Sequence, residues 1–261
     1  MSRLNFMAVG PEIRIQEFAG GAMLYDSSRA GNAAPGWLDA SWWAARGAVH
    51  AAGEGRGAAV MIEADGRSLV LRHYRRGGLM ARLVADRYWW RAAERTRSFR
   101  EWHLLYHMHR AGLPVPMPIA AGYRRRGGTY TADLLVKRIP GARSLAAAIR
   151  VASVPLGTWM AIGRCLRHFH ARGICHADLN AHNILLGEAE DDIWVIDFDR
   201  GSLRSPGWWS DANLVRLQRS LLKVTAAVGA ERFSAADWQM LLDSYLATAI
   251  ELRQIPALQN G

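Results

Sequence analysis

Three oxygen-bearing side chains in the second half of the chain are spaced as a metal-assisted transfer reaction requires. Asp178 and Asn183 lie in one polar segment, residues 176–183, which reads His-Ala-Asp-Leu-Asn-Ala-His-Asn. Asp197 follows at the end of a second short apolar run. A hairpin of this length brings Asn183 and Asp197 together, and their oxygens are ligands that Mg²⁺ prefers. Asp178 can then accept a hydrogen bond from a hydroxyl that attacks a metal-bound phosphate.

The same spacing, His-x-Asp-x-x-x-x-Asn, fits the catalytic loop of kinases, and residues 197–199 occupy the place of the kinase Asp-Phe-Gly. Either half alone is weak evidence, because an Asp after a strand is more often a turn residue. Both halves in register, after an amphipathic helix, favour catalysis. We therefore predict Asp178 as the catalytic residue and Asn183 and Asp197 as the magnesium ligands. His176 is expected to hold the loop in place.

The first half of the chain contains a glycine-rich segment that precedes a predicted strand. Gly53, Gly55 and Gly57 alternate with Glu and Arg in this segment. Glycines allow backbone N–H groups to approach phosphates closely, so we predict that these three cover the phosphates of a nucleotide.

A kinase strand lysine that contacts the phosphates has no counterpart here. The chain has only two lysines, Lys137 and Lys223, and neither lies in a suitable strand. Arg72 follows Val-Leu, where kinases carry Val-Ala-Ile-Lys, and arginine can bind phosphate and carboxylate in a bidentate manner. We predict Arg72 as the phosphate-contacting cation, with Glu101 as its helical partner. Neighbouring arginines at positions 75 and 76 remain alternatives.

The surrounding elements are predicted from periodicity. Short apolar runs at 58–63 and 68–73, joined by Asp-Gly, indicate a tight antiparallel hairpin. A three- and four-residue apolar spacing predicts a helix over 98–110, which Gly112 ends, and one or two strands follow at 129–139.

The second half of the chain changes character. Apolar residues from 159 to 169 indicate a helix ended by Gly173, and the runs at 184–186 and 193–196 predict a small hairpin. Later residues are helical, with a capping box at Ser234 and Asp237.

This order of elements predicts an α+β, protein-kinase-like two-lobed fold. Residues 1–138 form a small, strand-rich N-lobe with the glycine-rich loop, a sheet and one main helix. Residues 139–261 form a helical C-lobe with the catalytic loop and the metal-binding hairpin. Together they make one kinase-like domain.

Composition restricts the partners and the compartment. The chain has a net charge of +10, and ten arginines stand against two acids between residues 67 and 100. Such a local field attracts nucleic acid, an anionic membrane surface or a phosphorylated substrate. No apolar run is long enough to cross a bilayer, and residues 1–20 lack the pattern of a secretory signal, which predicts a cytoplasmic location. Cys165 and Cys175 are expected to be buried small hydrophobes.

Several segments resemble one family, the 3-deoxy-D-manno-octulosonic acid (Kdo) kinases, relatives of the lipopolysaccharide core heptose kinases. The resemblance extends from residue 53 to residue 223. It is carried by Leu-Arg-His-Tyr-Arg-Arg-Gly-Gly-Leu at 71–79, Leu-Pro-Val-Pro at 113–116, the stretch 174–186, Asp-Phe-Asp at 197–199, and Asn-Leu-Val-Arg-Leu-Gln-Arg-Ser at 213–220.

The resemblance implies phosphorylation of the 4-hydroxyl of a Kdo sugar on Kdo-lipid IVA, with ATP and Mg²⁺, in lipopolysaccharide core biosynthesis. It implies Asp178 as the active-site residue. The partners implied are Kdo-lipid IVA or a related precursor and the anionic inner-membrane surface, at whose cytoplasmic side the protein would be peripheral. Tyr88, Trp89 and Trp90 either insert at that surface or pack against the small lobe.

Two other functions are open from the sequence. A kinase-fold phosphotransferase could act on a core heptose, an aminoglycoside-like small molecule or a protein serine. A non-catalytic, nucleic-acid-binding module is disfavoured, because such a module gains nothing from metal ligands, and we expect no nucleic-acid partner.

Overall fold

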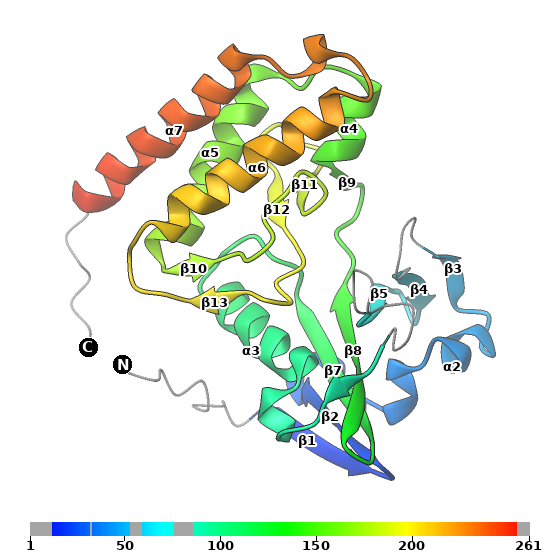
Figure 1. The fold of residues 1–261 in the computed structure, drawn as a ribbon. Helices are drawn as coiled ribbons and strands as arrows, with labels where there is room; N and C mark the ends of the chain where they lie inside the picture. Colours follow the sequence, from blue (N-terminus) through cyan, green and yellow to red (C-terminus); the bar gives the residue numbers. More distant parts are fainter. Residues whose placement is uncertain (1–11, 32, 53–58, 76–85, 255–261) are drawn as a thin grey trace. The chain divides into compact units, whose positions relative to one another are not determined.

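The computed structural model describes residues 12–31, 33–52, 59–75 and 86–254 of the 261-residue chain (Figure 1). The described chain divides into two compact units. The first holds the residues up to 107 together with 116–138, and the second holds 108–115 together with the residues from 139 onwards. The assignment of 1–138 and 139–261 as kinase-like lobes stays a prediction.

The first unit is built on an antiparallel sheet. Its strands follow the order β1 (Ile13–Phe18), β2 (Gly21–Asp26), β7 (Pro118–Arg126), β8 (Thr129–Lys137), β5 (Arg67–His73), β4 (Val60–Ala64) and β3 (Val49–Ala52), and β6 (Tyr88–Trp89) pairs with β8. The sequence analysis does not predict β1, a mostly exposed edge strand whose apolar alternation spans only residues 13–16 before Glu17 interrupts it. Only one strand, β8, occupies the predicted region 129–139.

The predicted hairpin is confirmed as β4 and β5, in which Val60 lies opposite Leu71. Its turn residues, Asp65 and Gly66, have φ of 51° and 69°. Positive φ at both central positions matches the twist of the flanking strands, which explains why Asp-Gly favours this turn.

One face of the sheet packs against α3 (Arg97–Arg110), which confirms the predicted helix, and Gly112 follows it with φ of 71°. Phe99 and Trp102 of α3 are buried, and the Ser98 hydroxyl donates a 2.8 Å hydrogen bond to the carbonyl of Gly122 on β7. This helix therefore lies directly on the middle of the sheet.

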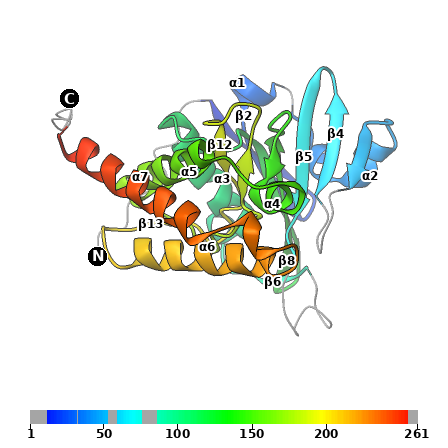
Figure 2. The same cartoon turned by 90° about the horizontal axis from the view of Figure 1, so that it is seen from above.

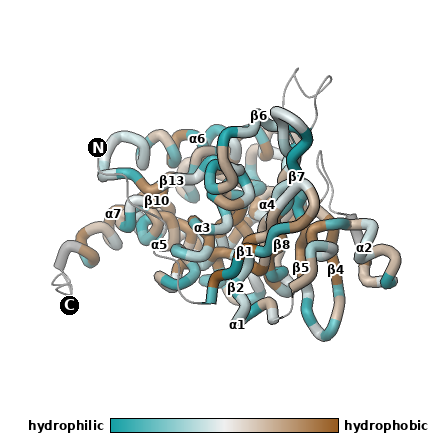
Figure 3. The backbone as a smooth tube through the Cα atoms, turned by 90° about the horizontal axis from the view of Figure 1, so that it is seen from below, coloured by the Kyte–Doolittle hydropathy of each residue, from teal (hydrophilic) through white to brown (hydrophobic). Residues whose placement is uncertain are grey.

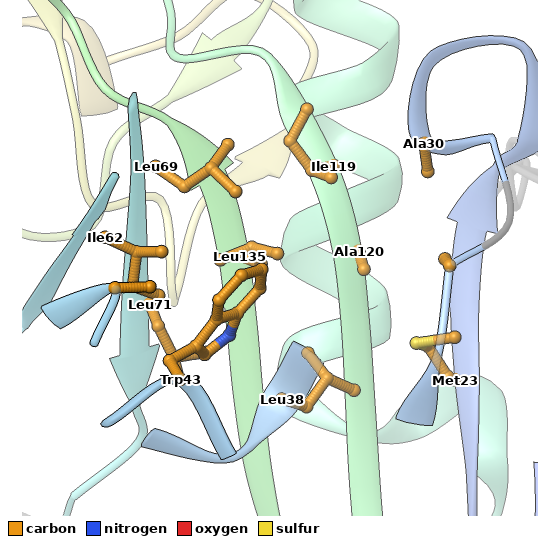
Figure 4. Packing of buried hydrophobic residues seen from close by; sticks show 12 residues of the cluster. Met23, Ala30, Leu38, Trp43, Ile62, Leu69, Leu71, Ile119, Ala120 and Leu135 are labelled. Carbon is orange, nitrogen blue, oxygen red and sulfur yellow. The ribbon is translucent and has the colours of Figure 1, made fainter. Parts of the chain in front are cut away.

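The opposite face is covered by the short helices α1 (Ser27–Ala30), η1 (Pro35–Leu38) and α2 (Ala40–Ala44). Figure 4 shows Leu38 and Trp43 from this layer beside Leu71 and Leu135 from the strands. Because side chains alternate along a strand, Leu71 enters this core and Arg72 points to the α3 face.

The second unit is mainly helical. Its helices are α4 (Leu145–Val151), α5 (Leu156–Ala171), α6 (Trp209–Thr225), η4 (Ala230–Arg232) and α7 (Ala235–Gln254). Small sheets are formed by β12 (Ile193–Val195), β11 (Ile184–Leu186) and β9 (Arg143–Ser144), and by β10 (Ile174–Cys175) and β13 (Ser202–Leu203).

Helices α5 and α7 run side by side (Figure 2). A Cβ atom at Gly163 of α5 would lie 2.2 Å from the backbone oxygen of Leu241 of α7, so the close approach requires glycine. The predicted capping box is confirmed, since the Asp237 N–H donates to Ser234 Oγ and the Ser234 N–H donates to Asp237 Oδ2. Among the described helices, none combines the length and apolar character that a bilayer crossing demands.

Candidate active site

The loop between β10 and β11 holds the backbone of Asp178 on both sides. Its N–H donates to Nδ1 of His176 at 3.1 Å. Its carbonyl accepts from Nδ2 of Asn180 at 2.8 Å and from Nδ2 of Asn183 at 2.9 Å. The side chain of Asp178 is 68% exposed. The loop therefore fixes the peptide and leaves the carboxylate facing solvent, where it can meet a substrate.

His176 joins this loop to the β11–β12 hairpin. It is buried, and its Nε2 lies 2.9 Å from the carbonyl oxygen of Ile196. Since Nδ1 accepts a hydrogen bond from Asp178, the proton must be on Nε2, which donates to Ile196. Burial lowers the pKa of His176 and keeps this neutral form. The expected structural role of His176 thus has a specific basis in two hydrogen bonds.

The hairpin positions the two predicted metal ligands. Ile184 pairs with Val195, and the Ile196 N–H donates to the Asn183 carbonyl at 2.9 Å, so Asn183 lies opposite the residue before Asp197. Asp197 has φ of 65°, a value rare outside glycine. Backbone conformations of this kind concentrate at functional sites.

These residues fit a magnesium ion held jointly with a substrate. Asn183 Nδ2 donates to the Asp178 carbonyl, so the nitrogen end of the amide has a partner within the loop and the amide oxygen is the atom that can serve as a metal ligand. No group of three or more His, Cys, Asp or Glu side chains within the described residues is arranged to hold a metal. A pair of one carboxylate and one amide would hold Mg²⁺ together with phosphate oxygens and water.

In the first unit, Arg72 and Glu101 form the predicted ion pair. Glu101 is buried and also accepts a 2.6 Å hydrogen bond from the Tyr74 hydroxyl. The Arg72 guanidinium lies 4.8 Å from the centre of the Tyr74 ring. A buried carboxylate and an aromatic face therefore orient this cation, whose contact with a nucleotide stays a prediction. The predicted Gly53, Gly55 and Gly57 lie outside the described residues.

Helix α6 supplies site residues that the spacing of the catalytic loop did not indicate. Asn213 Oδ1 accepts from the His176 N–H at 3.2 Å, and Ser220 Oγ accepts from the Ala181 N–H at 3.1 Å. Arg216 Nη1 lies 3.6 Å from Oδ1 of Asp178. Their positions three and four residues apart place them near one side of the helix, a signal that the sequence contains.

A sequence model of the lipopolysaccharide kinase (Kdo/WaaP) family matches residues 40–245. The chain belongs to this family. It is 48% identical over 206 residues to a 3-deoxy-D-manno-octulosonic acid kinase of Xylella fastidiosa (strain 9a5c), covering 78% of this chain and 81% of that protein. A protein of the same name from Haemophilus influenzae (strain 86-028NP) is 39% identical over 229 residues, covering 85% and 95%.

This member of the Kdo/WaaP family also has the predicted fold. A solved structure of WaaP in complex with acyl carrier protein aligns with a TM-score of 0.54 over 87% of this chain and 89% of that one, at 19% identity. The predicted resemblance and the α+β kinase-like fold are confirmed, and the chain is a kinase.

The aromatic segment 88–90 divides between the two expected roles. Tyr88 is buried against Tyr130, and the Trp90 ring lies 4.9 Å from that of Tyr123. Only Trp89 of the three is well exposed, at 74%. Of the two expected roles, packing is confirmed for Tyr88, which lies against the sheet and cannot insert into a membrane.

Proposed function

We propose that this kinase transfers the terminal phosphoryl group of ATP to the 4-hydroxyl of a Kdo sugar on Kdo-lipid IVA. The acceptor is supported by the names of relatives that are 39–48% identical over most of the chain. The observation that best supports phosphoryl transfer is that the Asp178 carboxylate is exposed while hydrogen bonds on both sides fix its peptide.

Each residue then has a role in the transfer. Asp178 accepts a hydrogen bond from the attacking hydroxyl, orients it and takes its proton as the new bond forms. Asn183 and Asp197 would hold Mg²⁺, which neutralises phosphate charge when bound. Arg72, oriented by Glu101, contacts phosphate oxygens in place of the usual lysine.

We place this reaction at the cytoplasmic side of the inner membrane, with the protein bound peripherally to anionic lipid. The support is the net charge of +10. Each basic residue near such a surface contributes about 1 kcal/mol to binding. No nucleic-acid partner is proposed.

The test is mass spectrometry of Kdo-lipid IVA after incubation with enzyme, ATP and Mg²⁺, with fragmentation to locate the phosphate. Asp178→Ala should lower turnover by at least about 10²-fold, the usual contribution of a general base. The fold should survive, because the side chain contributes only an exposed ion pair to Arg216. Asp191→Ala removes an exposed carboxylate from the turn of the neighbouring hairpin and serves as the matched control.

Two results would contradict the proposal separately. Equal turnover by Asp178→Ala and wild type would remove the role of Asp178. Phosphate on a heptose, an aminoglycoside or a protein serine, with none on Kdo-lipid IVA, would show that the proposed acceptor is wrong and that the chain is a kinase for another acceptor.

A further inference from the structure

The outward face of α6, together with its N-cap residue Trp208, exposes a stripe of large apolar side chains. Trp208, Val215 and Leu222 are 78%, 45% and 54% exposed. They recur every seventh residue, which is about two helical turns, so they align along the helix axis. Figure 3 shows hydrophobic and hydrophilic positions mixed along α6. The inward face is separate and contains the buried Leu217 and Leu221.

Basic residues border this stripe on one side. Arg216, Arg219 and Lys223 are exposed on α6, with Asp211 as the acid of its first turn. Successive residues of a helix are about 100° apart around its axis. Going around α6 from Val215, the three basic residues come first, and Ser220 and Asn213, which accept hydrogen bonds from the catalytic loop, come next on the same side. The basic flank therefore lies between the apolar stripe and the loop.

Two contacts tie this flank to the site. Arg216 lies 3.6 Å from the Asp178 carboxylate, and Ser220 on the same helix accepts a hydrogen bond from the Ala181 N–H of the loop. A surface that docks on α6 is thus adjacent to the predicted catalytic carboxylate.

The exposed apolar residues of α7 differ in charge. Leu246 and Ile250 are 58% and 59% exposed, but the exposed residues beside them include Asp243 and Glu251. An acidic border repels an anionic surface, whereas the basic border of α6 attracts one.

We propose that the α6 stripe (Trp208, Val215 and Leu222) and its basic flank (Arg216, Arg219 and Lys223) dock on an anionic phospholipid bilayer and present Asp178 to a lipid-linked acceptor. The proposal rests on the proposed function, since it assigns the surface that brings this enzyme to its acceptor. A tryptophan suits the headgroup region, aliphatic side chains insert below it, and arginine and lysine contact lipid phosphates.

The test is flotation of the full-length protein with vesicles of phosphatidylcholine and phosphatidylglycerol. The variant Val215→Glu/Leu222→Glu removes two aliphatic side chains and adds two negative charges on α6. The control Leu246→Glu/Ile250→Glu makes the same kind of change at two exposed aliphatic positions of α7. We expect the α6 variant to bind at least about tenfold more weakly than wild type, because each lost aliphatic contact and each added charge weakens docking. The control should stay within about twofold, because its added charges lie away from the docking surface.

A second variant isolates the charges. Arg219→Gln/Lys223→Gln should weaken binding to the anionic vesicles by about fivefold for each lost charge and leave binding to pure phosphatidylcholine unchanged. Circular dichroism checks that each variant is folded.

Activity measurements separate the α6 assignment from the proposed function. The α6 variant should phosphorylate Kdo-lipid IVA in detergent micelles at the wild-type rate and be slow only on vesicles. If wild type phosphorylates Kdo-lipid IVA and floats with anionic vesicles, but the α6 variant floats equally well, the α6 assignment is wrong and the proposed function stands. If wild type leaves Kdo-lipid IVA unmodified in micelles, the proposed function fails. If light scattering shows a wild-type dimer that the α6 variant disrupts, a second copy occupies the stripe and the bilayer assignment is overturned.

Discussion

Replacing His176 with Phe separates packing from hydrogen bonding at the centre of the site. The ring volume is nearly kept, and the contact with the Phe198 ring, 4.6 Å away between centres, can persist. Both imidazole hydrogen bonds are lost, so the Ile196 carbonyl and the Asp178 N–H lose their partner.

The cost can be estimated from these two groups. An unsatisfied buried polar group costs about 1–3 kcal/mol. Since the surroundings of both bonds are only partly buried, water can compensate in part, and we expect the free energy of unfolding to fall by about 2–4 kcal/mol. The Asp178 peptide also loses one of its anchors. A displacement near 1 Å costs roughly 10²-fold in rate, so we expect turnover to fall by about that factor.

Urea unfolding followed by tryptophan fluorescence measures the first effect, and phosphate transfer to Kdo-lipid IVA measures the second. The control is His182→Phe, the same change at an exposed histidine of the same loop, which should alter both quantities little. If His176→Phe unfolds more easily but turns over within about threefold of wild type, His176 does not position Asp178, since a 1 Å displacement would cost far more. If neither quantity changes, the two hydrogen bonds contribute neither to stability nor to turnover.

Two further predictions concern buried ionisable groups. Glu101→Gln, which removes the carboxylate partner of Arg72, should lower the free energy of unfolding by about 1.5–3 kcal/mol. Glu63→Gln in the half-exposed pair with Arg138 should change it by less than about 1 kcal/mol, and urea titration compares the two variants. Burial lowers the pKa of His170 from 6.5 to about 4, so the unfolded chain binds a proton that the folded chain does not, and stability should fall as the pH drops through that window. For each pH unit of the drop, the free energy of unfolding of wild type should then fall by about 1 kcal/mol more than that of His170→Gln. Equal pH dependence of the two unfolding free energies would show that His170 does not titrate in this way.

The catalytic loop and the hairpins could be predicted from the sequence because they depend on residues that are close together in the chain. The interval from Asp178 to Asn183 forms one loop, and the two apolar runs that follow can only pair as a tight hairpin, which leads to Asp197. The Asp-Gly pair predicted the β4–β5 turn for the same reason, because its backbone conformation is a property of adjacent residues.

The pairing of Arg72 with Glu101 could not be predicted from short spacings, because the two residues lie on a strand and on a helix. It was predicted by comparison with the strand lysine and helical glutamate of kinases. The structure places the two side chains together on the α3 face of the sheet. The first edge strand, β1, was not predicted, since its apolar alternation spans only four residues, which is a weak signal for a strand.

The sequence by itself determined which side chains could do chemistry and which short segments hold them, because these features depend on neighbours along the chain. Only the tertiary structure decided how they are supported. It brought His176 to the carbonyl of Ile196, placed Arg216 beside Asp178, and buried Tyr88 while leaving Trp208 exposed. Contacts and exposure of this kind depend on packing between segments far apart in the chain, and the pattern within any one segment does not encode them.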